Sequence, residues 1–207
     1  MCKHDTREQR PDVFKLRNLF ILPIKNGTYA ILRGEGYVDI PSINTLPIQY
    51  SSKLDFEIKS ASVGNSEMQH LDFAYATSLI RTFMNDDSLV LSIRGRKYTP
   101  EFSFKVGKYS LKAEGVQTEV DAGYEGRQQI VLVEAKNSLS TNVIIRQLFY
   151  PYRQWNIATG KMIISLFFER RDNVINLWQY DFEKPDEYNT IRLLRSGKYI
   201  IDTSKTA

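Results

Sequence analysis

The chain has few of the residues that build disulfide scaffolds and transition-metal centres. Its single cysteine, Cys2, excludes a disulfide within the chain and a cysteine-based zinc site. Its two histidines, His4 and His70, form no His-Glu-x-x-His motif and no histidine-rich metal centre. Any chemistry at an active site must therefore depend on carboxylates, lysine, arginine or hydroxyl groups.

Long apolar runs are also missing. The longest, such as residues 162–168, fall far short of the roughly 18 residues that a membrane-spanning helix needs. The first ten residues are charged rather than apolar, unlike a secretory signal. Together with the lone cysteine, these features predict a cytoplasmic protein that does not enter a membrane.

The overall composition is that of a globular protein. The 207 residues are 42% hydrophobic and carry 28 lysines and arginines against 24 acidic residues, a formal net charge of +4. This length predicts one compact domain, in which residues 1–60 form an N-terminal arm with accessory strands and residues 61–207 form the core. The small basic excess gives only a hint of a polyanionic partner.

The pattern of apolar residues predicts an α/β fold, a central mixed sheet flanked by helices. Ser66 is expected to cap a helix over residues 66–84, and a second helix is expected over 140–155, kinked or ended by Pro151. A turn is expected at residues 94–96. Strands are expected at residues 19–24, 29–32, 37–40, 89–93, 102–106, 117–124, 129–136, 162–168, 176–182 and 190–194.

The strand predicted at residues 129–136 ends in two charges. Its apolar run, residues 130–133, is typical of a strand buried on both faces, yet Glu134 and Lys136 follow on one face. Burying such charges costs several kcal/mol unless other groups compensate. A turn near residues 124–127 would bring Asp121 alongside Glu134. Two converging carboxylates suit Mg²⁺, and a nearby lysine can hold an attacking water or stabilise a phosphate.

This stretch, VDAGYEGRQQIVLVEAKN, with RQLFYPYRQW after it, resembles the PD-(D/E)XK nuclease superfamily and, within it, type II restriction endonucleases. The resemblance implies a restriction-endonuclease-like core, Mg²⁺ as cofactor and double-stranded DNA as substrate. It makes Asp121, Glu134 and the Ala135 carbonyl metal ligands, and adds Lys136 and Gln147 to the catalytic set. Two departures are that Val120 replaces the usual proline and that Pro151 stands where one subgroup has tyrosine.

A second Glu-x-Lys motif, Glu57-Ile58-Lys59, belongs to a stretch in which apolar and charged residues alternate. That alternation predicts a half-exposed strand, whose charges face solvent and need no special explanation. We therefore assign the site to the motif at Glu134.

Several residues carry two interpretations. Glu119 is either an additional metal ligand or a surface charge, and Glu67 is either a ligand supplied by a helix or a partner of the helix dipole. Gln147 either orients the metal-bound water or contacts a phosphate, or it is a buried amide that hydrogen-bonds to the backbone. His70 is interpreted as a helix-surface or packing residue rather than a catalytic one. DNA phosphates favour basic residues, although many such residues simply form a solvated face. The predicted DNA-binding residues are Arg94, Arg96, Lys97, Lys105, Arg146 and Arg153.

The leading hypothesis is a Mg²⁺-dependent endodeoxyribonuclease, a type II restriction enzyme or a subunit of one. Because one active site cuts one strand, a homodimer or a second nuclease or recognition subunit is expected. The alternatives are a nicking or repair-type nuclease subunit and a non-catalytic DNA-binding module.

Overall fold

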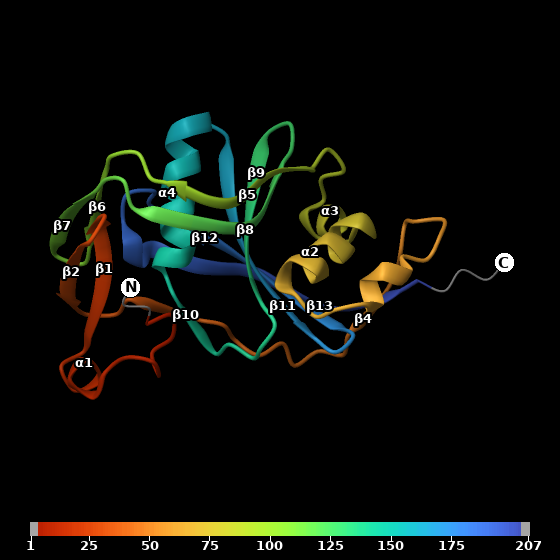
Figure 1. Cartoon of the computed structure of the whole chain (residues 1–207), viewed down its shortest axis with the longest axis horizontal. Coiled ribbons are helices and arrows are strands. Elements are labelled where there is room, and N and C mark those ends of the chain that lie inside the picture. Colours follow the sequence, from red (N-terminus) through yellow and green to blue (C-terminus); the bar gives the residue numbers. More distant parts are fainter. Residues whose placement is uncertain (1–3, 204–207) are drawn as a thin grey trace.

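A seven-stranded mixed sheet forms the centre of the computed structural model, which describes residues 4–203 (Figure 1). Cys2 lies outside the described residues. The strand order is β4-β13-β12-β11-β9-β8-β5, and only β9 with β11 and β4 with β13 are parallel neighbours. The α/β class with a mixed sheet is therefore confirmed. The strands are β4 (Ile48–Ser51), β5 (Val90–Tyr98), β8 (Gln117–Glu125), β9 (Gln129–Lys136), β11 (Met162–Arg171), β12 (Val174–Phe182) and β13 (Ile191–Asp202).

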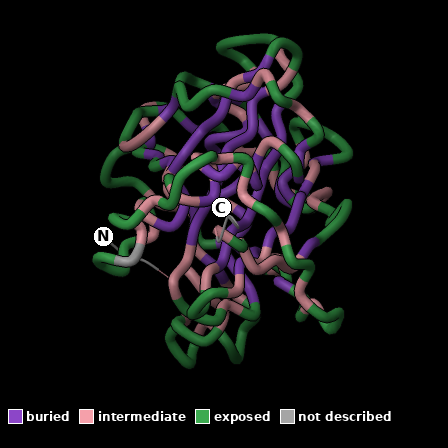
Figure 2. The backbone as a smooth tube through the Cα atoms, turned by 90° about the vertical axis from the view of Figure 1, so that its right-hand side faces the viewer, coloured by how far each residue is buried: buried purple, intermediate pink, exposed green. Residues whose placement is uncertain are grey.

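Helices cover both faces of this sheet. The α4 helix (Arg146–Thr159) packs on one face, and α2 (Glu67–Ala76) and α3 (Leu79–Met84) pack on the other. Ile130 and Leu132 of β9 enter the core under α4, whereas Val131 and Val133 enter the core under α2 and α3. The apolar run of β9 is thus buried on both faces, as expected, and the buried residues gather in the interior (Figure 2).

Two small hairpins, a two-stranded pair and a short helix lie to one side of the central sheet (Figure 1). The α1 helix (Asp12–Leu16) leads into the hairpin of β1 (Leu19–Lys25) and β2 (Thr28–Arg33), and β3 (Tyr37–Asp39) pairs with β10 (Asn142–Ile144). A second hairpin joins β6 (Phe102–Val106) to β7 (Tyr109–Ala113). Phe20 and Leu22 of β1 are fully buried in the same cluster as Phe149 of α4, so the N-terminal strands share a core with the sheet. Two 3-10 turns are η1 (Lys59–Ser62) and η2 (Tyr188–Thr190).

The two predicted helices have different bounds from those expected. The first is interrupted because Ser78 takes a left-handed conformation, with φ +68°, between α2 and α3. Its cap is as predicted, since Ser66 accepts a hydrogen bond from the Gln69 amide at 3.1 Å. The second begins at Arg146, because residues 142–144 pair with β3 instead, and it continues through Pro151.

Two local predictions are wrong. Residues 94–96 are not a turn: they lie inside β5, where Gly95 has φ +81° and the register with β8 shifts. The chain therefore bulges there without reversing. Residues 54–59 form no strand, since β4 ends at Ser51 and a 3-10 turn begins at Lys59. Within residues 4–203, no helix is both long and apolar enough to cross a membrane.

Candidate active site

Asp121 and Glu134 lie where β8 and β9 separate. The antiparallel ladder between these strands runs from the pair Glu125–Ile130 to the pair Ala122–Val133. Asp121 and Glu134 are the next residues on the two strands, just beyond its last pair. The Asp121 carboxylate accepts a hydrogen bond from the Ala135 amide at 2.8 Å, and this bond ties the two diverging strands together.

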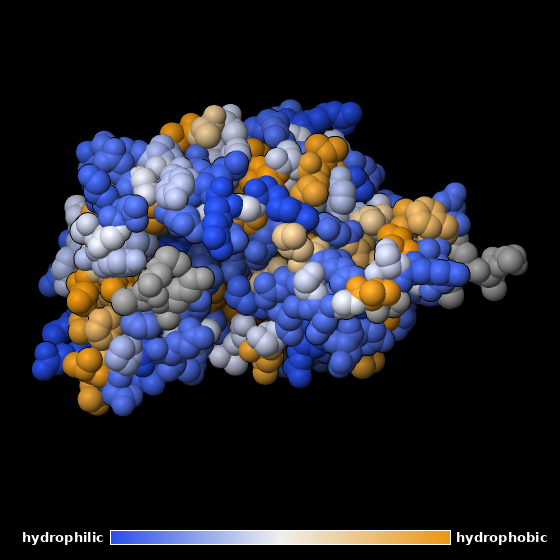
Figure 3. Space-filling model, viewed as in Figure 1, coloured by the Kyte–Doolittle hydropathy of each residue, from blue (hydrophilic) through white to orange (hydrophobic). Residues whose placement is uncertain are grey.

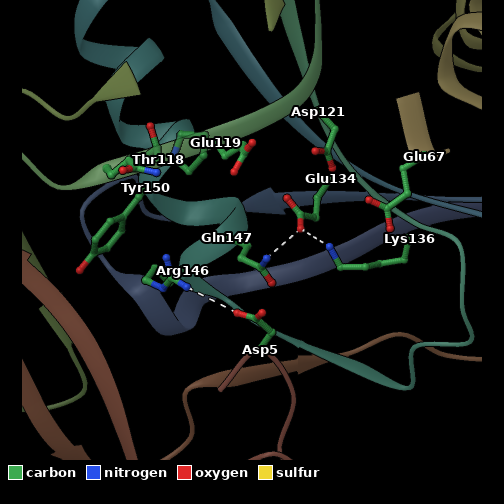
Figure 4. A pocket seen from close by; sticks show the side chains of 12 residues that line it. Asp5, Glu67, Thr118, Glu119, Asp121, Glu134, Lys136, Arg146, Gln147 and Tyr150 are labelled. Atoms are coloured by element: carbon green, nitrogen blue, oxygen red, sulfur yellow. Dashed lines mark hydrogen bonds and ion pairs between the residues drawn. The ribbon is translucent and has the colours of Figure 1, made fainter. Parts of the chain in front are cut away.

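One oxygen of Glu134 binds two side chains (Figure 4). Its Oε1 atom accepts hydrogen bonds from Lys136 Nζ at 2.6 Å and from Gln147 Nε2 at 2.8 Å. Glu134 is 8% exposed, so this ion pair is largely shielded from water. Gln147 reaches it from the first turn of α4. The structure thus brings together all four residues of the predicted catalytic set.

Burial dominates the electrostatics of the two acids. It raises the pKa of Glu134 to about 7; the negative charge of Asp121 adds to this rise, and the ammonium of Lys136 opposes it. Burial also raises the pKa of Asp121, against the hydrogen bond from Ala135. Burial alone would lower the pKa of Lys136, but the charge and hydrogen bond of Glu134 outweigh it and raise that pKa. Each acid would be easier to ionise beside a further cation.

These residues line a cavity of about 290 Å³ with an excess of negative charge. It holds five carboxylates but only two cationic side chains, although the whole chain has a net charge of +4. The charged residues are Asp5, Glu67, Glu119, Asp121, Glu134, Lys136 and Arg146. In residues 4–203, no three acidic, histidine or cysteine side chains form a ready-made metal-binding group. A pair of carboxylates nevertheless fits Mg²⁺, which usually keeps several waters and takes one or two protein carboxylates.

The two additional acids both line this cavity. Glu67 is the first residue of α2, and its carboxylate accepts a hydrogen bond from the Asn137 amide at 3.2 Å. Glu119 lies on β8, and its carboxylate forms an ion pair with Arg96 at 3.4 Å. Both acids therefore line the cavity, but among the described residues neither forms a group of three acids with Asp121 and Glu134 that could hold a metal ion.

The comparisons with known proteins give a family. Residues 32–200, more than half of the chain, match the model of a family described as Domain of unknown function (DUF6997). The chain belongs to the DUF6997 family. Residues 1–31 match the model of another domain of unknown function, DUF6996. The searches of curated proteins and of solved structures found no match.

The predicted DNA-binding residues of this DUF6997 protein have different surroundings. Arg146 alone among them lines the cavity, where it pairs with Asp5 at 3.7 Å. Three more lie on β5: Arg94 pairs with Asp72, Arg96 pairs with Glu119, and Lys97 is exposed. Lys105 is exposed on β6, whereas Arg153 packs over the ring of Phe102, 5.7 Å from its centre. The face drawn in Figure 3 is largely hydrophilic, with only small apolar patches.

Sequence reasoning missed Asp5, Thr118 and Tyr150 among the residues that line the cavity. Asp5 reaches the site because its carbonyl accepts a hydrogen bond from the Ile144 amide at 2.9 Å. That contact joins distant parts of the chain and has no signal in the sequence. Tyr150 is buried, and its hydroxyl donates a hydrogen bond to the Pro23 carbonyl at 2.8 Å. His70 is likewise buried, and its Nε2 atom is hydrogen-bonded to Asn65 Oδ1 at 2.8 Å.

Proposed function

We propose that this DUF6997 protein is a Mg²⁺-dependent endodeoxyribonuclease of the PD-(D/E)XK type, acting on double-stranded DNA in the cytoplasm. One observation carries the proposal. The half-buried carboxylate of Asp121 and the buried carboxylate of Glu134 meet where two sheet strands diverge, and a lysine two residues after Glu134 binds it. In this proposal, the seven-stranded sheet with α4 on one face is the restriction-endonuclease-like core.

The carboxylates of Asp121 and Glu134, with the Ala135 carbonyl, would hold the magnesium ion. When bound, the ion supplies positive charge beside the phosphate and makes the attacking water more acidic. Lys136 neutralises Glu134 in the structure. Once a divalent cation takes over that neutralisation, the ammonium group is available to hydrogen-bond the water or a phosphate oxygen. Gln147 holds the Glu134 carboxylate in place from α4.

The reaction would be hydrolysis of a phosphodiester bond. Water attacks phosphorus, the bond from phosphorus to the 3′ oxygen breaks, and the products are a 5′ phosphate and a 3′ hydroxyl. This polarity follows from the resemblance to restriction endonucleases. Arg146, which lines the cavity, is the basic residue best placed to bind a phosphate next to the cleaved bond.

The second candidate is a nicking or repair-type subunit. It is favoured by the observation that three predicted DNA-binding arginines are already ion-paired with acids of the same chain. Because these three arginines are already paired, a homodimer or a recognition subunit would supply further contacts to DNA. A non-catalytic DNA-binding module is the third candidate, and the intact set of two acids and a lysine argues against it.

Incubation with supercoiled, unmethylated plasmid DNA in Mg²⁺ or in EDTA tests the proposal. Discrete linear fragments formed only in Mg²⁺ would support a site-specific endonuclease. Open circles alone would favour the nicking subunit. Salt-sensitive DNA binding without any Mg²⁺-dependent cleavage would favour the binding module and contradict the nuclease assignment.

A further inference from the structure

A second, much smaller cavity lies between the sheet and the first turns of α4, directly beside Glu134. Its volume is about 10 Å³. A cavity of roughly this size holds one water molecule when two or more polar groups face it. The residues that line it and enter the argument are Leu132, Glu134, Gln147, Leu148, Pro151 and Ser165.

Ser165 gives this cavity an unpartnered hydroxyl group. It lies in the middle of β11, opposite Leu132 in the parallel ladder with β9, and it is 1% exposed. Its side chain shares a face with Ile163 and Phe167, which pack into the cluster under α4. Its Oγ atom has no hydrogen-bond partner among the described residues. A buried hydroxyl without a partner is costly, so a ligand for it is expected.

Gln147 gives the cavity a second polar atom without a partner. Its Nε2 atom donates to Glu134, but its Oε1 atom is buried and accepts no hydrogen bond from the described residues. Pro151 lies one helical turn later and has no amide hydrogen to donate to the Gln147 carbonyl. Pro151, which also lines the cavity, therefore adds no donor for the unpartnered Gln147 oxygen.

We propose that this cavity binds one ordered water molecule that bridges Ser165 Oγ and Gln147 Oε1, and that Ser165 is a positioning residue of the candidate active site. The water donates to Gln147 Oε1 and accepts the hydroxyl hydrogen of Ser165. By holding the amide oxygen there, the water stabilises the orientation in which Gln147 presents its nitrogen to Glu134. The reversed amide would place an oxygen against the carboxylate, where the two would repel each other. The effect on catalysis rests on the proposed function, whereas the water site does not.

NMR of the metal-free protein tests the water site without any assay of activity. We expect a nuclear Overhauser effect between a long-lived water and the side-chain amide protons of Gln147, identified by their loss in Gln147→Ala. Ser165→Ala should remove this effect and shift the amide signals. Ser103→Ala, which removes an exposed hydroxyl on β6, should change neither. Absence of the effect in the wild type, or unchanged Gln147 signals in Ser165→Ala, would overturn the proposal.

Single-turnover cleavage tests whether Ser165 acts through Gln147. Ser165→Ala should lower the rate by about 10-fold in the wild-type background, as is typical for residues that hold an active-site group in place. In the Gln147→Ala background it should lower the rate no further, because the group that it positions is gone. Equal losses in both backgrounds would show an independent structural role and overturn the proposal. If the wild-type protein cleaves no DNA, the proposed function fails, and the NMR result still decides the water site.

Discussion

Ionisation of Glu134 should weaken the metal-free fold as the pH rises from 5 to 8. Burial raises the pKa of this carboxyl from the ordinary 4.5 to about 7 in the folded protein. The folded state therefore holds this proton more tightly than the unfolded state does. The resulting stabilisation is fully present below about pH 4.5 and is lost as the pH rises through about 7. Between pH 5 and pH 8, such a difference in pKa corresponds to a loss of about 2–3 kcal/mol.

Urea unfolding in EDTA measures this loss. Glu134→Gln has no proton to release, so its free energy of unfolding should fall less between pH 5 and pH 8 than that of the wild type. The difference between the two proteins should be about 2–3 kcal/mol. Asp121, whose pKa is also raised, remains in both proteins, so the difference between them reports the titration of Glu134 together with its coupling to Asp121. Glu57→Gln, at an exposed position, should behave like the wild type. Equal pH dependence in the wild type and Glu134→Gln would show that Glu134 does not titrate between pH 5 and pH 8.

Magnesium extends the same experiment. Because an ion bound by ionised Asp121 and Glu134 stabilises only the folded state, Mg²⁺ at ten times its Kd should restore about 1.4 kcal/mol at pH 8. Glu134→Gln should gain much less. Equal stabilisation of both proteins by Mg²⁺ would place the ion elsewhere.

Three further predictions concern catalysis and folding. Lys136→Met should lower single-turnover cleavage by at least about 100-fold while leaving the Kd for DNA nearly unchanged, as measured by fluorescence anisotropy; a strongly weakened Kd would assign Lys136 to binding. Gly123→Ala should lower the free energy of unfolding in urea by about 1–3 kcal/mol, because a Cβ atom there would lie 2.6 Å from the Cβ of Ile93. An unchanged free energy of unfolding would contradict this packing. Ser66→Ala should lower the free energy of unfolding by about 1 kcal/mol, because Ser66 accepts a hydrogen bond from the Gln69 amide. Ser66→Asp, which keeps an acceptor at this position, should retain the stability of the wild type.

Features of the fold that depend on local pattern were predictable. The apolar run of β9 and the two charges that end it are visible in the sequence, because alternation determines which side chains share a face. The approach of Asp121 to Glu134 was also predictable, since a short turn joins their strands. Three of the four candidate catalytic residues, Asp121, Glu134 and Lys136, could therefore be predicted from the sequence.

Features of the fold that depend on tertiary contacts could not be predicted from the sequence. The bulge at Gly95 resembles a turn in the sequence, since a glycine between two arginines fits both, and only the pairing with β8 distinguishes them. The break at Ser78 is held by packing of α2 and α3 and lacks a glycine or proline signal. Asp5 and Ser165 come from elements that no local pattern connects to the site.

The most direct test compares the two Glu-x-Lys motifs in one plasmid-cleavage assay. We expect the wild type and Glu57→Gln to cut DNA at the same Mg²⁺-dependent rate and Glu134→Gln to cut none. Both variants replace one glutamate by a glutamine of almost the same shape, so they differ only in which of the two motifs is changed. Cleavage that survives Glu134→Gln, or that is lost in Glu57→Gln, would contradict the assignment of the active site to Asp121, Glu134 and Lys136.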